Sequence, residues 1–357
     1  MEGKNKSSEL VAFIVMVIME GCTIGLTILA KTAITNGMSP FVFIVYTNAL
    51  STIILFPSSF LLKQQQDRKE KPLFSLSLFM RFLFLGFTGI TMTQTLLFLG
   101  LSYSSPILVC AMSHLIPTFN FLLNIIHRKI ELNLRSYGIQ VQMIGIMVSL
   151  MGAIVAEFFK GPLIRHSSHN LRHTKQLFVF SSTPEFWVFG GILLAAASFS
   201  VSIGNFIQKE TIKQYPEQMK VVSYYTLLGT ILSAIVSSIL ERDANAWKLK
   251  SNMELILIVL TATFGGAIRP NIQVWFSRTK GPLYVPQFKP FGIAFATTFG
   301  VCFFPNSLHY GSVIGASVIG MGYYTILYGE FKGDIEDEEN SDSLDKKIPL
   351  LQENMEV

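Results

Sequence analysis

Residues 281–301 read GPLYVPQFKPFGIAFATTFGV, an apolar segment that is long enough to cross a bilayer and yet contains Lys289. A helix of about 20 apolar residues spans the roughly 30 Å of hydrocarbon in a membrane. A charge near the centre of such a helix costs about 2.5–3.5 kcal/mol on insertion scales, so it generally faces a partner or a polar cavity. The segment therefore predicts a membrane protein with a polar interior.

Comparable apolar segments recur along the 357 residues, of which 50% are hydrophobic and only 14% are charged, with a mean hydropathy of +0.46. Ten such segments lie at residues 10–33, 39–62, 78–101, 107–126, 136–156, 186–207, 219–240, 252–276, 283–304 and 309–328. They lack the period-two alternation of membrane β-strands, whereas helices satisfy their own backbone hydrogen bonds in lipid. We therefore predict an all-α membrane protein with ten transmembrane helices.

The second five segments repeat the spacing of the first five, with starts offset by 173 to 180 residues. Because five is odd, the second unit enters the membrane from the opposite side, as in the inverted repeats of alternating-access transporters. We predict a first repeat at 1–157, an extracytosolic linker at 158–185 and a second repeat at 186–328. The acidic segment 329–357 is too polar to bury a core, so we expect a disordered cytosolic tail.

The net charge of +5 does not indicate a nucleic-acid partner, because the lysines and arginines are spread over loops. If the N-terminus is cytosolic, 18 of the 28 lysines and arginines fall on that side, and the positive-inside rule then places both termini in the cytosol. The sequence contains no P-loop, nucleophile elbow or metal-spaced cysteine and histidine cluster. We therefore predict no enzyme activity, no cofactor and no metal. The histidines at 166, 169 and 173 fit a solvated linker better than a metal site.

Four strongly polar side chains fall inside the predicted helices: Glu20, His114, Arg269 and Lys289. Such groups mark substrate or ion pathways, although a structural ion pair between Glu20 and Lys289 is the alternative interpretation. Prolines interrupt the fourth and ninth segments. These segments correspond in the repeat, and irregular backbone in corresponding helices indicates a site near the membrane midplane.

Weaker polar and aromatic residues extend this candidate site. Gln94 and Asn120 belong to polar sets at helical spacing, which line either neighbouring helices or a hydrated cavity. Tyr46 and Trp275 could enclose a ligand, although aromatic residues in membrane helices more often pack or face lipid. The candidate substrate-binding residues are Glu20, Lys289, Arg269, His114, Gln94, Asn120, Tyr46 and Trp275.

Several stretches resemble the plant members of the drug/metabolite transporter superfamily with EamA-type repeats, the Walls-Are-Thin-related (UMAMIT, nodulin-like) transporters. The stretches are AKTAITNGMSPFVFIVY at 30–46, SHLIPTFNFLL at 113–123, LNLRSYGIQVQMIG at 132–145, FFKGP at 158–162, SRTKGPLYVPQFKP at 277–290 and LHYGSVIGASVIGMGYY at 308–324. The resemblance implies ten helices around a central cavity, cytosolic termini, and movement of amino acids, auxin or related metabolites across the plasma or vacuolar membrane. Many relatives carry asparagine where this chain has His114 and Lys289, which bears on the substrate.

The charges of the candidate site favour a carboxylate ligand. Arg269 and Lys289 stand against Glu20 alone, so a ligand carboxylate could neutralise the remaining positive charge. We therefore predict a transporter of amino acids or related small carboxylates, acting as an exporter or in both directions. Glu20 would meet an ammonium group or carry a coupling proton. An auxin (indole acetate) transporter and a membrane scaffold or receptor acting through the acidic tail are the alternatives, and the sequence leaves proton coupling and a homodimer open.

Overall fold

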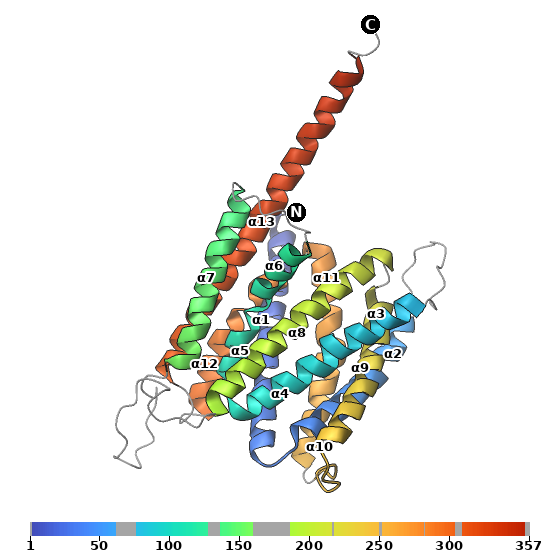
Figure 1. Ribbon diagram of the computed structural model, residues 1–357, viewed down its shortest axis with the longest axis vertical. Helices are drawn as coiled ribbons and strands as arrows, with labels where there is room; N and C mark the ends of the chain where they lie inside the picture. The colour runs from blue at the N-terminus through green and yellow to red at the C-terminus, as the bar shows by residue number, and fades with distance from the viewer. Residues whose placement is uncertain are drawn as a thin grey trace.

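The computed structural model describes residues 2–61, 76–127, 136–159, 186–215, 218–249, 252–281, 283–303 and 309–353. Within these ranges, every regular element of three or more residues is a helix, and the helices form a bundle (Figure 1). The first half contains α1 (Glu2–Thr35), α2 (Pro40–Leu61), α3 (Leu76–Gly86), the π-helix η1 (Phe87–Met92), α4 (Thr93–Tyr103), α5 (Pro106–Ser113), α6 (Ile116–Ile126) and α7 (Tyr137–Phe158).

The second half contains α8 (Phe186–Gln214), α9 (Gln218–Leu240), α10 (Asn252–Thr263), the π-helix η3 (Phe264–Ile268), α11 (Arg269–Lys280), the 3₁₀ turn η4 (Pro286–Phe288), α12 (Phe291–Phe303) and α13 (Tyr310–Glu353). Eight described stretches are long and apolar enough to cross a bilayer, and Pro40–Phe56 is a shorter apolar helix. With α12, these elements account for all ten predicted segments. The predicted all-α, ten-helix fold class is confirmed.

Helices of the two halves pack against each other in matched pairs. The first span (α1) packs on the ninth (α12), and the sixth (α8) packs on the fourth (α5 and α6). The second packs on the seventh (α2 with α9), and the fifth packs on the tenth (α7 with α13). Each contact thus has its counterpart when the halves are exchanged, as an inverted repeat requires. The N-terminal end of α1 and the extension of α13 lie at the same end of the bundle (Figure 1), as an even number of crossings requires.

Irregular backbone also recurs at matching places in the two halves. The third span contains η1 and the eighth contains η3, and Gly89 and Gly265 lie within these π-helices, 176 residues apart. The fourth span breaks at His114 and the ninth breaks around Lys289. Proline explains both breaks, since Pro117 and Pro290 lack the N–H that would continue the helical ladder. π-Helices and broken helices occur frequently at functional sites.

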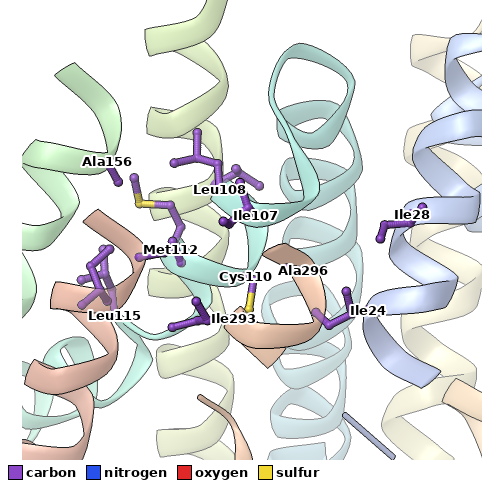
Figure 2. Packing of buried hydrophobic residues seen from close by; sticks show 14 residues of the cluster. Ile24, Ile28, Ile107, Leu108, Cys110, Met112, Leu115, Ala156, Ile293 and Ala296 are labelled. Atoms are coloured by element: carbon purple, nitrogen blue, oxygen red, sulfur yellow. The ribbon is translucent and has the colours of Figure 1, made fainter. Parts of the chain in front are cut away.

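The two broken spans meet at the largest apolar cluster. Figure 2 shows side chains of α5 between those of α1, on one side, and those of α7 and α13, with Ile293 and Ala296 of α12 close by. Cys110 of α5 lies against Gly292, where an added Cβ would come within 3.2 Å of its sulfur. This packing fixes the position of the two breaks relative to each other.

Small residues bring α7 and α13 into direct backbone contact, which we call the glycine seam (Gly138, Gly145 and Gly152 on α7; Gly315, Gly322 and Gly329 on α13). A Cβ added at Gly145 would lie 2.8 Å from the backbone nitrogen of Ile326, and one at Gly152 would lie 2.6 Å from that of Ile319. Such distances leave no room for any side chain. The seam therefore requires glycine at these positions.

Along the segment for which a disordered tail is predicted, α13 continues as a helix to Glu353. Extending an existing helix needs no new nucleus, so each added residue costs little even without tertiary contacts. The linker at 158–185 lies almost wholly outside the described residues, and so do its three histidines.

Candidate functional site

Three of the predicted ionisable residues come together in the interior of the bundle. Glu20, in the middle of α1, is only 4% exposed, and its Oε1 lies 4.0 Å from Nη2 of Arg269 at the start of α11. Lys289 lies near enough for the charges of both residues to act on it. We call these three residues the charge cluster. When Lys289 is protonated, two cations face one carboxylate, and this arrangement would attract an anionic group.

The break of the ninth span fixes the backbone position of Lys289. Its N–H donates to the carbonyl of Pro286 at 3.1 Å, which ends η4. Two tyrosines of α13 cap carbonyls at the break: Tyr323 donates to Pro286 O and Tyr324 donates to Gln287 O, each at 2.9 Å. Broken helices in membranes need other groups to satisfy the freed backbone carbonyls, and the two tyrosine hydroxyls do so here.

The Tyr323 hydroxyl is expected to stabilise this break more than the Tyr324 hydroxyl. Each hydroxyl donates to a backbone carbonyl at the same distance, but Tyr323 is only 4% exposed whereas Tyr324 is 42% exposed. Tyr323→Phe removes a buried hydrogen bond and should cost about 0.5–1.5 kcal/mol, because Pro286 O still accepts from the N–H of Lys289. The matched control Tyr324→Phe should cost less, because solvent or lipid headgroups can replace its hydroxyl. Thermal unfolding of the two purified variants in detergent compares them, and equal losses would contradict the asymmetry.

His114 lies at the break of the fourth span and is fully buried. Its Nδ1 is 2.6 Å from the carbonyl of Cys110, and its ring packs edge-on against Tyr323 with centroids 5.0 Å apart. The ring also lies near enough to the backbone of Lys289 to interact with it. Two serines of α8 stabilise the same break, since Ser198 donates to Met112 O at 2.8 Å and Ser202 donates to Ile116 O at 3.0 Å. His114 thus links the two broken spans through Tyr323.

The structure places Gln94 in a second polar network, between α2, α4 and α9. Oε1 of Gln94 accepts a hydrogen bond from Asn48 at 2.7 Å, and Asn48 also donates to Ser233 at 3.4 Å. Thr52 and Thr230 join these helices at 2.7 Å. These bonds connect the second, third and seventh spans and occupy the amide oxygen of Gln94 within the protein.

The remaining predicted site residues occupy separate places. Tyr46 donates to the backbone oxygen of Trp247 at 2.8 Å, which ties α2 to the segment between α9 and α10. Trp275 is 60% exposed and packs against Phe276. Asn120 is half-buried on α6. The structure therefore brings together Glu20, Arg269 and Lys289, and His114 lies near enough to Lys289 to interact with its charge and its backbone.

One buried carboxyl group, that of Glu157 near the end of α7, was not predicted from the sequence. It lies one residue beyond the predicted segment 136–156, at the last position of the predicted first repeat, so it was not counted among the polar side chains inside the helices. An acid that directly follows an unbroken apolar segment was the available signal. Within the described ranges, no three histidine, cysteine or acidic side chains lie close enough to hold a metal ion.

Comparisons with known proteins agree with this architecture. The profile described as "EamA-like transporter family" matches residues 9–157. One WAT1-related protein of Arabidopsis thaliana is 49% identical over 98% of this chain and 94% of its own length, and another is 47% identical over 97% and 96%. A solved crystal structure covers 90% of this chain and 96% of its own, with a TM-score of 0.51 and 15% identity, which supports the fold alone.

Proposed function

The chain belongs to the WAT1-related proteins of the EamA-like transporter family, and from this premise we propose that it carries amino acids or related small carboxylates through the charge cluster. It is an integral, multi-pass membrane protein of a transporter family. The observation that carries the proposal is the grouping of Arg269 and Lys289 around Glu20 at the break of the ninth span.

The electrostatics of the cluster favour a ligand with a carboxylate. Lys289 offers three donors, and the positive end of α12 begins two residues later. Half-helix N-termini aimed at anionic substrate groups are a recurring feature of transporters built from inverted repeats. A carboxylate that binds Lys289 would neutralise the remaining charge without breaking the contact between Glu20 and Arg269. An amino acid would add an ammonium group, from which the carboxylate of Glu20 could accept a hydrogen bond.

One observation favours auxin as the second candidate substrate. Glu20 already faces Arg269 at 4.0 Å, so a ligand without an ammonium group would leave no carboxylate unpaired. Indole acetate is such a ligand, because it has a carboxylate and no ammonium group. The two substrates differ in whether Glu20 must leave Arg269 when the ligand binds.

A flux assay tests the proposal and separates these candidates. Oocytes or yeast expressing the fluorescently tagged chain should move labelled glutamine faster than controls in efflux, uptake or both. Unlabelled amino acids should compete more strongly than indole acetate if the ammonium contact exists. Absence of flux for amino acids and auxins, with the protein at the cell surface, would contradict the proposal. Loss of function on truncation after Gly333, but not on neutralising the cluster, would indicate a scaffold acting through its tail.

We further place both termini in the cytosol, because the loops on that side carry most of the lysines and arginines. The plasma membrane and the vacuolar membrane are both compatible with this orientation, and the same fluorescent fusion distinguishes them.

A further inference from the structure

A carboxyl group outside the charge cluster is buried between α7 and α8. Glu157 is 7% exposed, and neither of its side-chain oxygens has a hydrogen-bond partner in the part of the chain that the structure describes. An ionised carboxylate in such a place costs several kcal/mol, which the neutral acid avoids. Glu157 therefore lies in a site that favours a bound proton.

The neighbouring helix is shaped to admit this side chain. The Glu157 carboxyl lies so close to Gly191 of α8 that a methyl group there would overlap both oxygens. Residues on either side are apolar: Ala156 on α7 and Leu194 on α8 belong to the largest apolar cluster, and Trp187 packs against it. These neighbours provide no set of oxygen ligands for a metal cation, so the proton is the fitting occupant.

The helices that pack on α7 place no counter-charge on Glu157. On α8, the first charged residue is Lys209, 18 residues beyond Gly191, which corresponds to about 27 Å along a helix. On α5 the titratable residue is Cys110, and near the start of α13 they are His309 and Tyr310. No charged side chain of the described chain acts appreciably on Glu157.

We propose that Glu157 is a proton-binding residue that links protonation to the separation of α7 and α8 during transport, which rests on the proposed transport function. With the helices together, as in this structure, the side chain is the neutral acid. When α8 moves away from α7, water reaches the carboxyl, which gives its proton to a water molecule and becomes a carboxylate. The helices then close again only after the carboxylate has regained a proton. In this proposal Glu157 carries the proton, and Glu20, which faces Arg269, does not.

The first experiment follows stability against pH and needs no substrate. In the unfolded chain the carboxyl ionises above about pH 4.3, while the buried carboxyl of the folded chain keeps its proton to higher pH. Stability should therefore fall as pH rises between about 5 and 8, with the unfolding equilibrium shifting by up to about tenfold per pH unit for one proton. Glu157→Gln should remove that component. The control Glu210→Gln, in an exposed pair with Lys213, should retain it.

The second experiment measures labelled glutamine flux in liposomes with an imposed pH gradient. The wild type should respond to the gradient, whereas Glu157→Gln should transport without responding. If the flux of Glu157→Gln responded to the pH gradient as the wild type does, the inference would be overturned. It would also be overturned if Lys160→Gln abolished the response equally, because Glu157 would then act through an ion pair with Lys160. Absence of flux in the wild type would instead count against the transport function, and the pH profile of stability would still test Glu157.

The packing against Gly191 provides an independent check. Gly191→Ala should be destabilising alone but nearly neutral in the background of Glu157→Ala, because the truncated side chain leaves room for the methyl group. Additive losses would mean that the two residues do not touch.

Discussion

Transport is expected to fall about 10- to 100-fold when Lys289 is replaced by alanine. A hydrogen bond to a charged group contributes about 1.5–3 kcal/mol, and about 1.4 kcal/mol corresponds to a factor of ten in affinity. Lys289 is the cation left over once Glu20 faces Arg269, so its loss removes the positive charge that would hold a carboxylate. The loss should appear mainly as a raised KM for labelled glutamine.

The matched control is Lys280→Ala, which removes a lysine from the partly exposed end of α11, where it lies 4.0 Å from Glu9. Surface pairs of this kind contribute little, so flux should change little. The double variant Glu20→Gln with Lys289→Ala separates binding from structure. If Lys289 only balanced Glu20, the double variant would regain the flux and the amount of protein that the single variant loses. Unchanged transport in Lys289→Ala at normal surface expression would exclude the charge cluster as the substrate site.

The second large effect concerns the glycine seam. Gly152→Ala should destabilise the protein by about 1–3 kcal/mol, the usual cost of overpacking a tight contact. The added methyl would lie 2.6 Å from the nitrogen of Ile319 and 3.0 Å from the carbonyl of Gly315, and backbone atoms cannot move aside as a flexible side chain can. Unfolding temperature in detergent, followed by size-exclusion chromatography, measures the loss.

Gly25→Ala is the matched control, since it makes the same change inside α1 where nothing lies within 4 Å of the new methyl. Alanine is the better helix former by about 1 kcal/mol, so this variant should be neutral or slightly more stable. Equal stability of the two variants would show that α7 and α13 are less tightly packed than the structure indicates.

Hydropathy predicted the ten helices because the thickness of the bilayer fixes both their length and their apolar character. The break of the fourth span at Pro117 and that of the ninth at Pro290 were likewise predictable, since proline acts locally on the backbone. The π-helices η1 and η3 carry no proline at their centres, and nothing in their residues alone distinguishes them from α-helix.

The partners of the polar residues were harder to predict, because they lie far apart in the sequence. Gln94 was equally compatible with a cavity and with a neighbouring helix, and the Asn48 amide that binds it is 46 residues away. Tyr46 finds its acceptor 201 residues away, at Trp247. Spacing along one helix identifies a shared face, but it does not identify which element that face meets.

The glycine seam also has a mechanical meaning. Sliding α7 along α13 by one residue, a rise of about 1.5 Å, would bring larger side chains to positions that admit only glycine. The two helices must therefore move as one rigid body. Through Tyr323, that body also holds the backbone beside Lys289. In the transport cycle that we propose, α7 and α13 form the rigid part, and α8, which packs against Glu157, is the helix that moves away from it.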